Sequence, residues 1–150
     1  MTTQYLNLWK STVRVLTDTI TDLLPISPGL VFMNMDAHAE IAEWPNQDIV
    51  GLAMFGIEFD EHMVVVNFAV GVSTYEDPQL LRHVTIMDAL VDKFKPGVTH
   101  VVLDAAAGTP VGWARTTNGT IVKPMERTES RPLQFIVATL ATGLSYRLDQ

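Results

Sequence analysis

Two long extended runs constrain the fold more than any other feature of this chain. Residues 49–59 and 62–72 are rich in β-branched and aromatic side chains, and only two acidic residues separate them. Alternate positions of the second run carry Val64, Val66, Phe68, Val70 and Val72. A period of two is typical of a strand that buries one face, so we predict a long antiparallel hairpin packed against a helix. Gly51 and Gly56 indicate a β-bulge or a close approach by another backbone.

Residues 5–24 form an amphipathic pattern. Apolar side chains recur there at spacings of three or four, which places them on one stripe of a helix. The stripe consists of Leu6, Trp9, Val13, Leu16, Ile20 and Leu23. Pro25 follows directly and cannot continue the helical hydrogen-bond ladder. The sequence therefore predicts a first helix that ends just before Pro25.

A second helix is predicted to begin at Asp77 and Pro78. Aspartate favours the N-cap, and proline favours the first helical position because its missing N–H would be unpaired there anyway. Pro96-Gly97 ends the pattern. The expected apolar stripe consists of Leu80, Val84, Met87, Val91 and Phe94, widened by Leu81 and Leu90.

The remaining elements are shorter, apart from the last. Residues 30–35 and 98–104 are predicted strands, whereas residues 36–46 are a loop, a strand edge or a short helical turn. Asn118-Gly119 favours a type I′ turn, so the flanking segments are expected to form a short hairpin. Residues 133–142 alternate as a long final strand. We predict one α+β domain over residues 1–150, an antiparallel sheet with a long hairpin and two helices packed on one face.

Composition excludes several functional classes. The chain has 10 Lys and Arg against 17 Asp and Glu, a net charge of −7 that argues against unaided nucleic-acid binding. It has no cysteine, which excludes disulfides, thiolate metal sites and cysteine nucleophiles. No apolar stretch approaches the roughly 20 residues that span a bilayer. With no recognisable signal peptide, we expect a soluble protein that is made in a cytoplasm and does not contact membranes.

Asp36, His38 and Glu40 are the residues most suggestive of a metal site. On an extended segment their spacing places two carboxylates and an imidazole on one face, a set that binds divalent ions. The alternative is a solvated edge that also carries Glu43, and we favour it because no second cluster completes a site. We expect no metal, cofactor or catalytic residue. Of the other histidines, His62 is expected to be exposed in a turn, and His83 is expected to lie off the apolar stripe of its helix. His100 is expected to be partly buried in a strand.

Basic residues gather in the last third of the chain. Because Glu126 and Glu129 lie among them, they are interpreted as one side of a charge-complementary protein interface rather than as a nucleic-acid groove. These basic residues are Arg115, Lys123, Arg127 and Arg131. The three tryptophans have two interpretations, namely peripheral core packing, which is favoured, or an interface anchor. They are Trp9, Trp44 and Trp113.

Four segments together resemble the tail terminator family of long-tailed bacteriophages, also called tail completion or minor tail proteins. In chain order they are LNLWKSTVRVLTDTITDLLP, GLAMFGIEFDEHMVVVNFAVGV, DPQLLRHVTIMDALVDKF and RPLQFIVATLAT. The family consists of small α+β proteins with an N-terminal helix, a long hairpin, a second helix and a closing strand. The resemblance is one of element order and length over nearly the whole chain, and it transfers no functional residue.

The resemblance implies a structural role in the virion rather than an enzymatic one. Such proteins form a ring, typically of six subunits, at the head-proximal end of the tail, after assembly in the host cytoplasm. The implied partners are further copies of the chain, the tail tube protein and the head–tail connector protein. A ring needs a heterologous interface whose rotation closes. Our hypothesis for that interface pairs one acidic and one basic group across subunits, namely Asp36, Glu40 and Glu43 against Arg115, Arg127 and Arg131.

Two other functions remain open at this point. One is an acidic protein-binding module similar to secretion chaperones, which are also small α+β proteins and which dimerise around an effector segment. The other is a small enzyme or ligand-binding domain that uses Asp36, His38 and Glu40. A dimer in solution would favour the chaperone-like module, and a hexameric ring would favour the terminator.

Overall fold

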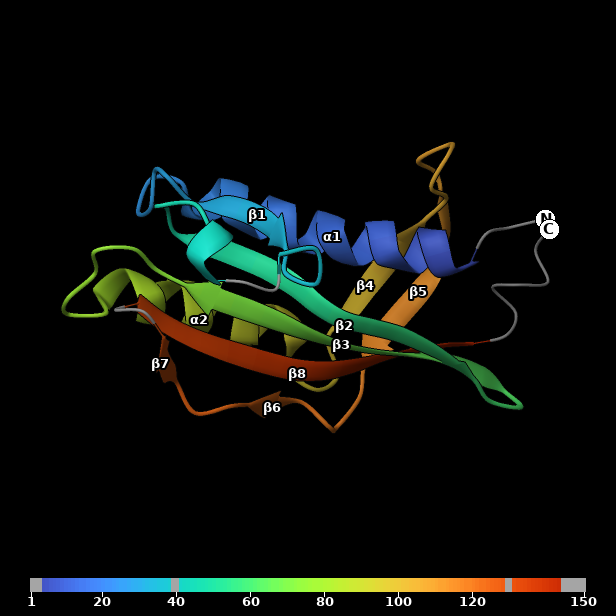
Figure 1. Cartoon of the computed structure of the whole chain (residues 1–150). Helices are drawn as coiled ribbons and strands as arrows, with labels where there is room; N and C mark the ends of the chain where they lie inside the picture. The colour runs from blue at the N-terminus through green and yellow to red at the C-terminus, as the bar shows by residue number, and fades with distance from the viewer. Residues whose placement is uncertain (1–3, 39–40, 129–130, 144–150) are drawn as a thin grey trace.

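The computed structural model describes residues 4–38, 41–128 and 131–143, and it is an α+β fold built on one curled sheet (Figure 1). Two α-helices and a short 3-10 helix accompany the strands. In chain order the elements are α1 (Gln4–Leu23), β1 (Val31–Asn34), η1 (Ile41–Glu43), β2 (Ile49–Phe59), β3 (Met63–Ser73), α2 (Leu81–Phe94), β4 (Thr99–Leu103), β5 (Pro110–Thr116), β6 (Ile121–Val122), β7 (Glu126–Thr128) and β8 (Arg131–Gly143).

The sheet is mixed rather than wholly antiparallel, which corrects the prediction. Its strand order is β1-β2-β3-β8-β5-β4, and β6 and β7 also pair with β8. β1 runs parallel to β2, whereas the other pairs are antiparallel. The reason lies in the connection between Asn34 and Ile49, which contains η1 and brings the chain back in the same direction. We call the described residues of this connection, 35–38 and 41–48, the crossover.

β2 and β3 pair along their whole length, from Ile49 opposite Ser73 to Phe59 opposite Val64. The register shifts between Ala53 and Gly56, which confirms the predicted bulge. Within the bulge Met54 has a positive φ of 53°. Its N–H donates to Oδ2 of Asp36 over 3.0 Å, so a side chain from the crossover stabilises the irregular backbone.

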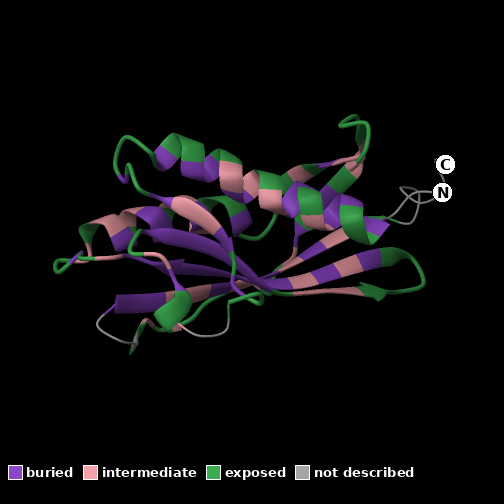
Figure 2. Ribbon diagram, turned by 45° about the horizontal axis from the view of Figure 1, so that its top comes forward, coloured by how far each residue is buried: buried purple, intermediate pink, exposed green. Residues whose placement is uncertain are grey.

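Each face of the sheet has its own core. The larger core lies between the sheet and both helices, and it buries the predicted alternating set of β3, from Val64 to Val72. The smaller core lies on the other face beneath the crossover, where Met33, Met35 and Trp44 pack against Leu133 and neighbouring side chains. In Figure 2 the central strands between the layers are coloured mostly as buried. The crossover therefore covers part of one face of the sheet, and the two helices cover the opposite face.

α1 is rotated relative to the stripe predicted from its apolar residues. Leu6 is exposed, whereas Asn7 and Ser11 are buried. The Asn7 side chain accepts the N–H of Ala105 at 2.8 Å, and the Ser11 hydroxyl accepts the N–H of Leu103 at 3.0 Å. These polar groups satisfy backbone donors at the end of β4, an edge strand that would otherwise be open to further pairing.

α2 also differs from the prediction at its start and in its buried face. It begins at Leu81 instead of Pro78, after Leu80 in a left-handed conformation with φ 59°. Asp77 still stabilises the helix, because its Oδ2 accepts the N–H of His83 at 2.9 Å. The predicted stripe residues Leu81 and Val84 are exposed. The buried residues of α2 are His83, Ile86, Met87, Leu90 and Phe94.

The short hairpin predicted at Asn118-Gly119 is wrong. β5 and β6 pair with different parts of β8 instead of with each other, and β4 is the antiparallel neighbour of β5. Neither Asn118 nor Gly119 has the positive φ that a type I′ turn requires. β5, β6 and β7 each form their ladder hydrogen bonds with a different segment of the long strand β8. The chain therefore follows the edge of β8 instead of folding back on itself.

Candidate functional site

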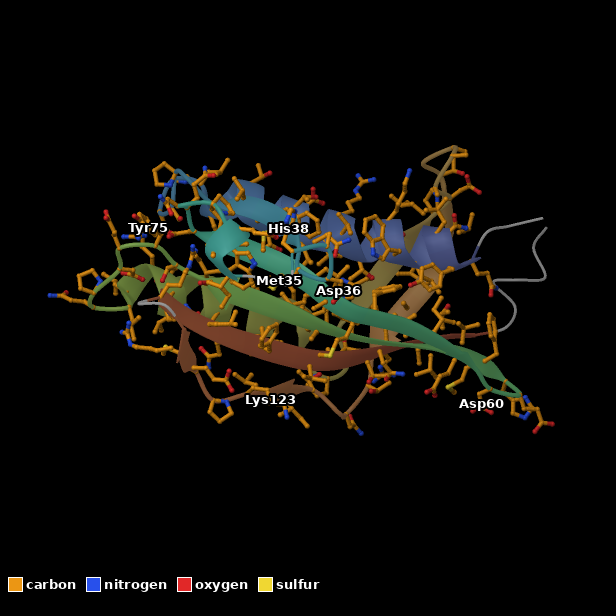
Figure 3. All side chains as sticks on the ribbon, viewed as in Figure 1. Met35, Asp36, His38, Asp60, Tyr75 and Lys123 are labelled. Carbon is orange, nitrogen blue, oxygen red and sulfur yellow. The ribbon has the colours of Figure 1, made fainter. Side chains whose placement is uncertain are left out.

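Two of the residues considered as metal ligands, Asp36 and His38, lie in the crossover. Asp36 and His38 are exposed and belong to a turn in which the N–H of His38 donates to the carbonyl of Met35, so the extended geometry expected for them is wrong (Figure 3). Glu40 lies outside the described residues. Glu43 is exposed on η1. Within residues 4–38, 41–128 and 131–143 no three His, Asp or Glu side chains come together as metal ligands.

The three arginines of the hypothetical interface occupy different environments. Arg115 on β5 and Arg127 on β7 are exposed. Arg127 lines a cleft of about 310 Å³ together with Glu76 and Asp77, so acidic residues of its own subunit lie beside it. Arg131 is only 6% exposed, and it is therefore not part of a surface patch. Of the three arginines in the predicted interface, Arg115 and Arg127 are therefore exposed and Arg131 is buried.

Arg131 instead holds the crossover against the sheet. Its Nε donates to the Ser73 hydroxyl at 2.8 Å, and its two Nη atoms donate to the carbonyls of Pro45 at 3.0 Å and Gln47 at 2.7 Å. The guanidinium also lies 5.8 Å from the ring centroids of both Trp44 and Tyr75. Burial lowers the pKa of this guanidinium from its ordinary value. The contacts are those of a structural clamp between β3, β8 and the crossover.

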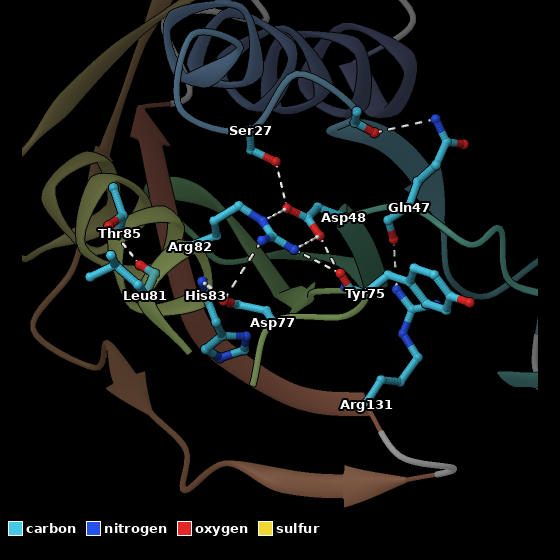
Figure 4. A network of polar contacts seen from close by, with 11 residues as sticks. Ser27, Gln47, Asp48, Tyr75, Asp77, Leu81, Arg82, His83, Thr85 and Arg131 are labelled. Carbon is cyan, nitrogen blue, oxygen red and sulfur yellow. Dashed lines mark hydrogen bonds and ion pairs between the residues drawn. The ribbon is translucent and has the colours of Figure 1, made fainter. Parts of the chain in front are cut away.

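A second buried polar cluster lies next to this clamp and is centred on Asp48 (Figure 4). Its Oδ2 accepts from Nε of Arg82 at 2.8 Å and from the Ser27 hydroxyl, and its Oδ1 accepts from the N–H of Tyr75 at 2.9 Å. Arg82 also lies 3.9 Å from Asp77. Burial alone would raise the pKa of Asp48, but these hydrogen bonds outweigh it and hold the pKa below its usual value.

An open cleft of about 370 Å³ lies over the Arg131 clamp. Its walls combine aromatic rings with polar groups, which is a mixture suited to binding a side chain or a peptide. It is lined by Ile41, Ala42, Trp44, Asn46, Tyr75, Glu76 and Arg131. Each guanidinium nitrogen of Arg131 already donates to the protein, so the cleft offers packing surface more than free charge.

The histidines are accounted for individually. His62 is exposed in the β2–β3 turn, as predicted. His83 was expected on the polar side of its helix, but it is fully buried, with Nε2 at 2.9 Å from Oε1 of Gln134. His100 is partly buried, as predicted, and its Nε2 bonds the Lys93 carbonyl at 2.8 Å. Burial lowers the pKa of His100, more than the hydrogen bond to the Lys93 carbonyl raises it.

Sequence reasoning missed one surface, which we call the hairpin tip and define as residues 58–63. All six residues are exposed, and the tip extends beyond the body of the molecule with Asp60 at its end (Figure 3). Phe59 is 61% exposed, although aromatic side chains usually lie in the core. Three acidic residues flank Phe59 in the sequence, namely Glu58, Asp60 and Glu61. The signal in the sequence was this aromatic residue within an acidic turn.

A second exposed surface lies on the outer side of the last two strands in the sheet order. We call it the β4–β5 face and define it as Thr99, Val101, Trp113 and Arg115. Val101 is the cross-strand partner of Trp113, and Thr99 is the partner of Arg115, so the four side chains share one face. Trp113 is 66% exposed, so the favoured core-packing interpretation is wrong for this tryptophan, whereas Trp44 is buried in the smaller core.

Comparisons with known proteins add no relative. A scan against protein families finds no match to this chain, and a search of curated proteins finds none at a significant level. Neither described helix is long and apolar enough to cross a membrane. The functional argument therefore rests on the surfaces themselves.

Proposed function

We propose that the chain is a structural virion protein, a tail terminator that forms a ring on the tail tube and joins it to the head connector. The order of elements agrees with the pattern quoted above for that family, from the N-terminal helix through the β2–β3 hairpin and α2 to the long β8. The proposal assigns no catalytic residue, metal or cofactor to the chain. Its partners are further copies of itself, the tail tube protein and the connector protein, at the head-proximal end of the tail.

The observation that supports this proposal best is that the subunit has two unlike exposed surfaces. The hairpin tip is acidic with exposed Phe59, and the β4–β5 face is apolar with exposed Trp113 and Arg115. A contact between unlike surfaces is heterologous, and a heterologous contact generates a ring when its rotation closes. Aromatic and arginine side chains are also the types that contribute most to protein interfaces.

Tube assembly in vitro tests the proposal. Purified chain is added to the polymerising tail tube protein encoded in the same genome, and tube lengths are measured by negative-stain electron microscopy. We expect shorter tubes with a ring of extra density at one end. Tubes of unchanged length with bare ends, at a molar excess of the chain, would contradict the terminator role.

A chaperone-like binding module is the second candidate, and the cleft over Arg131 favours it. The cleft is lined by the aromatic residues Trp44 and Tyr75 together with the polar residues Asn46 and Glu76, a combination that suits an extended peptide segment. Such a module would dimerise rather than form a ring. Light scattering coupled to size-exclusion chromatography distinguishes the two oligomers, and the identity of the neighbouring genes separates a tail operon from a secretion operon.

A further inference from the structure

We propose that the hairpin tip of one copy docks on the β4–β5 face of a second copy. The inference deepens the proposed function, since it names the two surfaces that would form the ring contact, and to that extent it rests on that function. It replaces the pairing expected from sequence, in which Arg131 took part, because Arg131 is buried within its own subunit.

The strand register places the relevant charges at opposite ends of one row. Glu58 is opposite Val65, Val65 is opposite Ala141, and Ala141 is opposite Arg115. These four side chains lie on the same face of the sheet, away from the helices. Three strand spacings separate Glu58 from Arg115, a distance of about 14 Å. No ion pair joins these two charges among the described residues of the subunit.

Within the described part of the chain, neither charged end of the row takes part in an ion pair. The ion pairs among the described residues involve α1, α2 and Asp48, and none includes Arg115 or a carboxylate of the hairpin tip. The middle of the row is small and apolar, with half-buried Val65 and Ala141. The row is therefore acidic at one end, apolar in the middle and basic at the other end. A neighbouring copy can place its acidic end against the basic end of the first.

The two surfaces match in chemistry. The tip offers Phe59 and Met63 with three carboxylates, and the β4–β5 face offers Trp113 and Val101 with one guanidinium. Aromatic contact supplies apolar burial, and the opposite charges set the orientation and reject a tip-to-tip encounter. Because every copy has both surfaces, head-to-tail contacts repeat until the rotation closes. Because each surface has its complement on the same chain, the partner of the hairpin tip is a second copy of this protein.

The absence of cysteine from the chain makes a crosslinking test clean. One variant has Asp60→Cys in the tip, and another has Thr99→Cys at the rim of the β4–β5 face, where it leaves Trp113 and Arg115 intact. The two full-length variants are mixed with a short bismaleimide and separated on denaturing gels. We expect at least about tenfold more crosslinked dimer in the mixture than with Asp60→Cys plus Asp18→Cys, because Asp18 is an exposed residue on α1.

Charge reversal provides the second arm. Arg115→Glu in the Thr99→Cys chain should reduce the crosslinked yield about tenfold, and Glu58→Arg in the Asp60→Cys chain should restore much of it. Circular dichroism of each variant confirms that it is folded. Equal crosslinking with the Asp18→Cys control, stronger crosslinking of Asp60→Cys with itself, or no effect of either reversal would overturn the docking proposal.

A chain with both cysteines separates this inference from the proposed function. Head-to-tail docking in a ring should give a ladder of products that ends at one closed oligomer. Crosslinked dimers without a closed product would support the contact between the two surfaces but contradict the formation of a ring. Shortened tubes in the assembly experiment without specific crosslinking would support the terminator function but contradict this contact.

Discussion

Arg82 donates from Nε to Oδ2 of Asp48 over 2.8 Å and from Nη2 to the Tyr75 carbonyl over 2.7 Å. Asp48 directly precedes β2, and Arg82 is the second residue of α2. The ion pair therefore joins the start of the central hairpin to the start of the helix that follows it. Asp48 is almost fully buried, whereas a third of the Arg82 side chain is exposed.

Replacing Asp48 with alanine should lower the free energy of unfolding by about 2 kcal/mol. The change removes the acceptor for Arg82, Ser27 and the Tyr75 N–H at once, and partial hydration of Arg82 keeps the loss below that for breaking a fully buried pair. Urea unfolding followed by fluorescence measures it. The matched control is Asp92→Ala, which removes an exposed pair with Lys95 and should leave the urea midpoint unchanged. Equal midpoints for both variants would contradict the structural role of Asp48.

Arg131 and Arg115 should behave in opposite ways when each is replaced by alanine. Arg131→Ala removes three hydrogen bonds that hold the crossover and should destabilise the fold by about 3 kcal/mol. Arg131→Lys should recover only part of the loss, because an ammonium lacks the planar fork that reaches all three acceptors. Arg115→Ala should leave stability unchanged. Urea midpoints that fall equally for Arg131→Ala and Arg115→Ala would contradict this assignment.

Strands that alternate strictly could be predicted together with their buried faces. In β3 a shift of one residue would move the buried valines and Phe68 to the other side, so the pattern indicates which face meets the helices. β8 also alternates, but both of its faces carry apolar side chains and each face meets one of the two cores. The helices were harder, since Asn7, Ser11 and His83 are buried to satisfy specific hydrogen bonds. A count of apolar residues cannot detect such partners, because they are distant in the sequence.

The candidate surfaces were predicted only in part, for a similar reason. The exposure of Trp113 was one of two interpretations, and the burial of Arg131 has no signal in the local sequence. Its three acceptors come from β3 and from the crossover, and only the assembled sheet places them around it. The predicted turn at Asn118-Gly119 is wrong because the flanking strands form their backbone hydrogen bonds with the long edge of β8 instead of with each other.

Gly51 should not tolerate a larger side chain while Met35 is present. Gly51 and Gly71 are cross-strand partners, and the Met35 side chain occupies the space where a Cβ would lie on either of them. Gly51→Ala should therefore destabilise the fold by about 1–3 kcal/mol. In a double-mutant cycle, Met35→Ala should make Gly51→Ala less costly, because it vacates that space. Gly29→Ala is the control, since a Cβ there contacts nothing. Strict additivity of Gly51→Ala and Met35→Ala in urea unfolding would contradict the packing.

The stability of the fold should fall in two separate steps as the pH decreases. Burial lowers the pKa of His100 below its usual 6.5, so the unfolded chain binds that proton more readily and stability declines as the pH falls from about 6.5 to the folded pKa. The stabilisation from Asp48 is complete above its usual 3.8 and is lost only as the pH falls through its lowered folded value. His100→Gln should flatten the upper step and leave the lower one, in urea midpoints measured from pH 8 to pH 2. His62→Gln removes an exposed histidine as the control, and an upper step unchanged by His100→Gln would show that another group causes it.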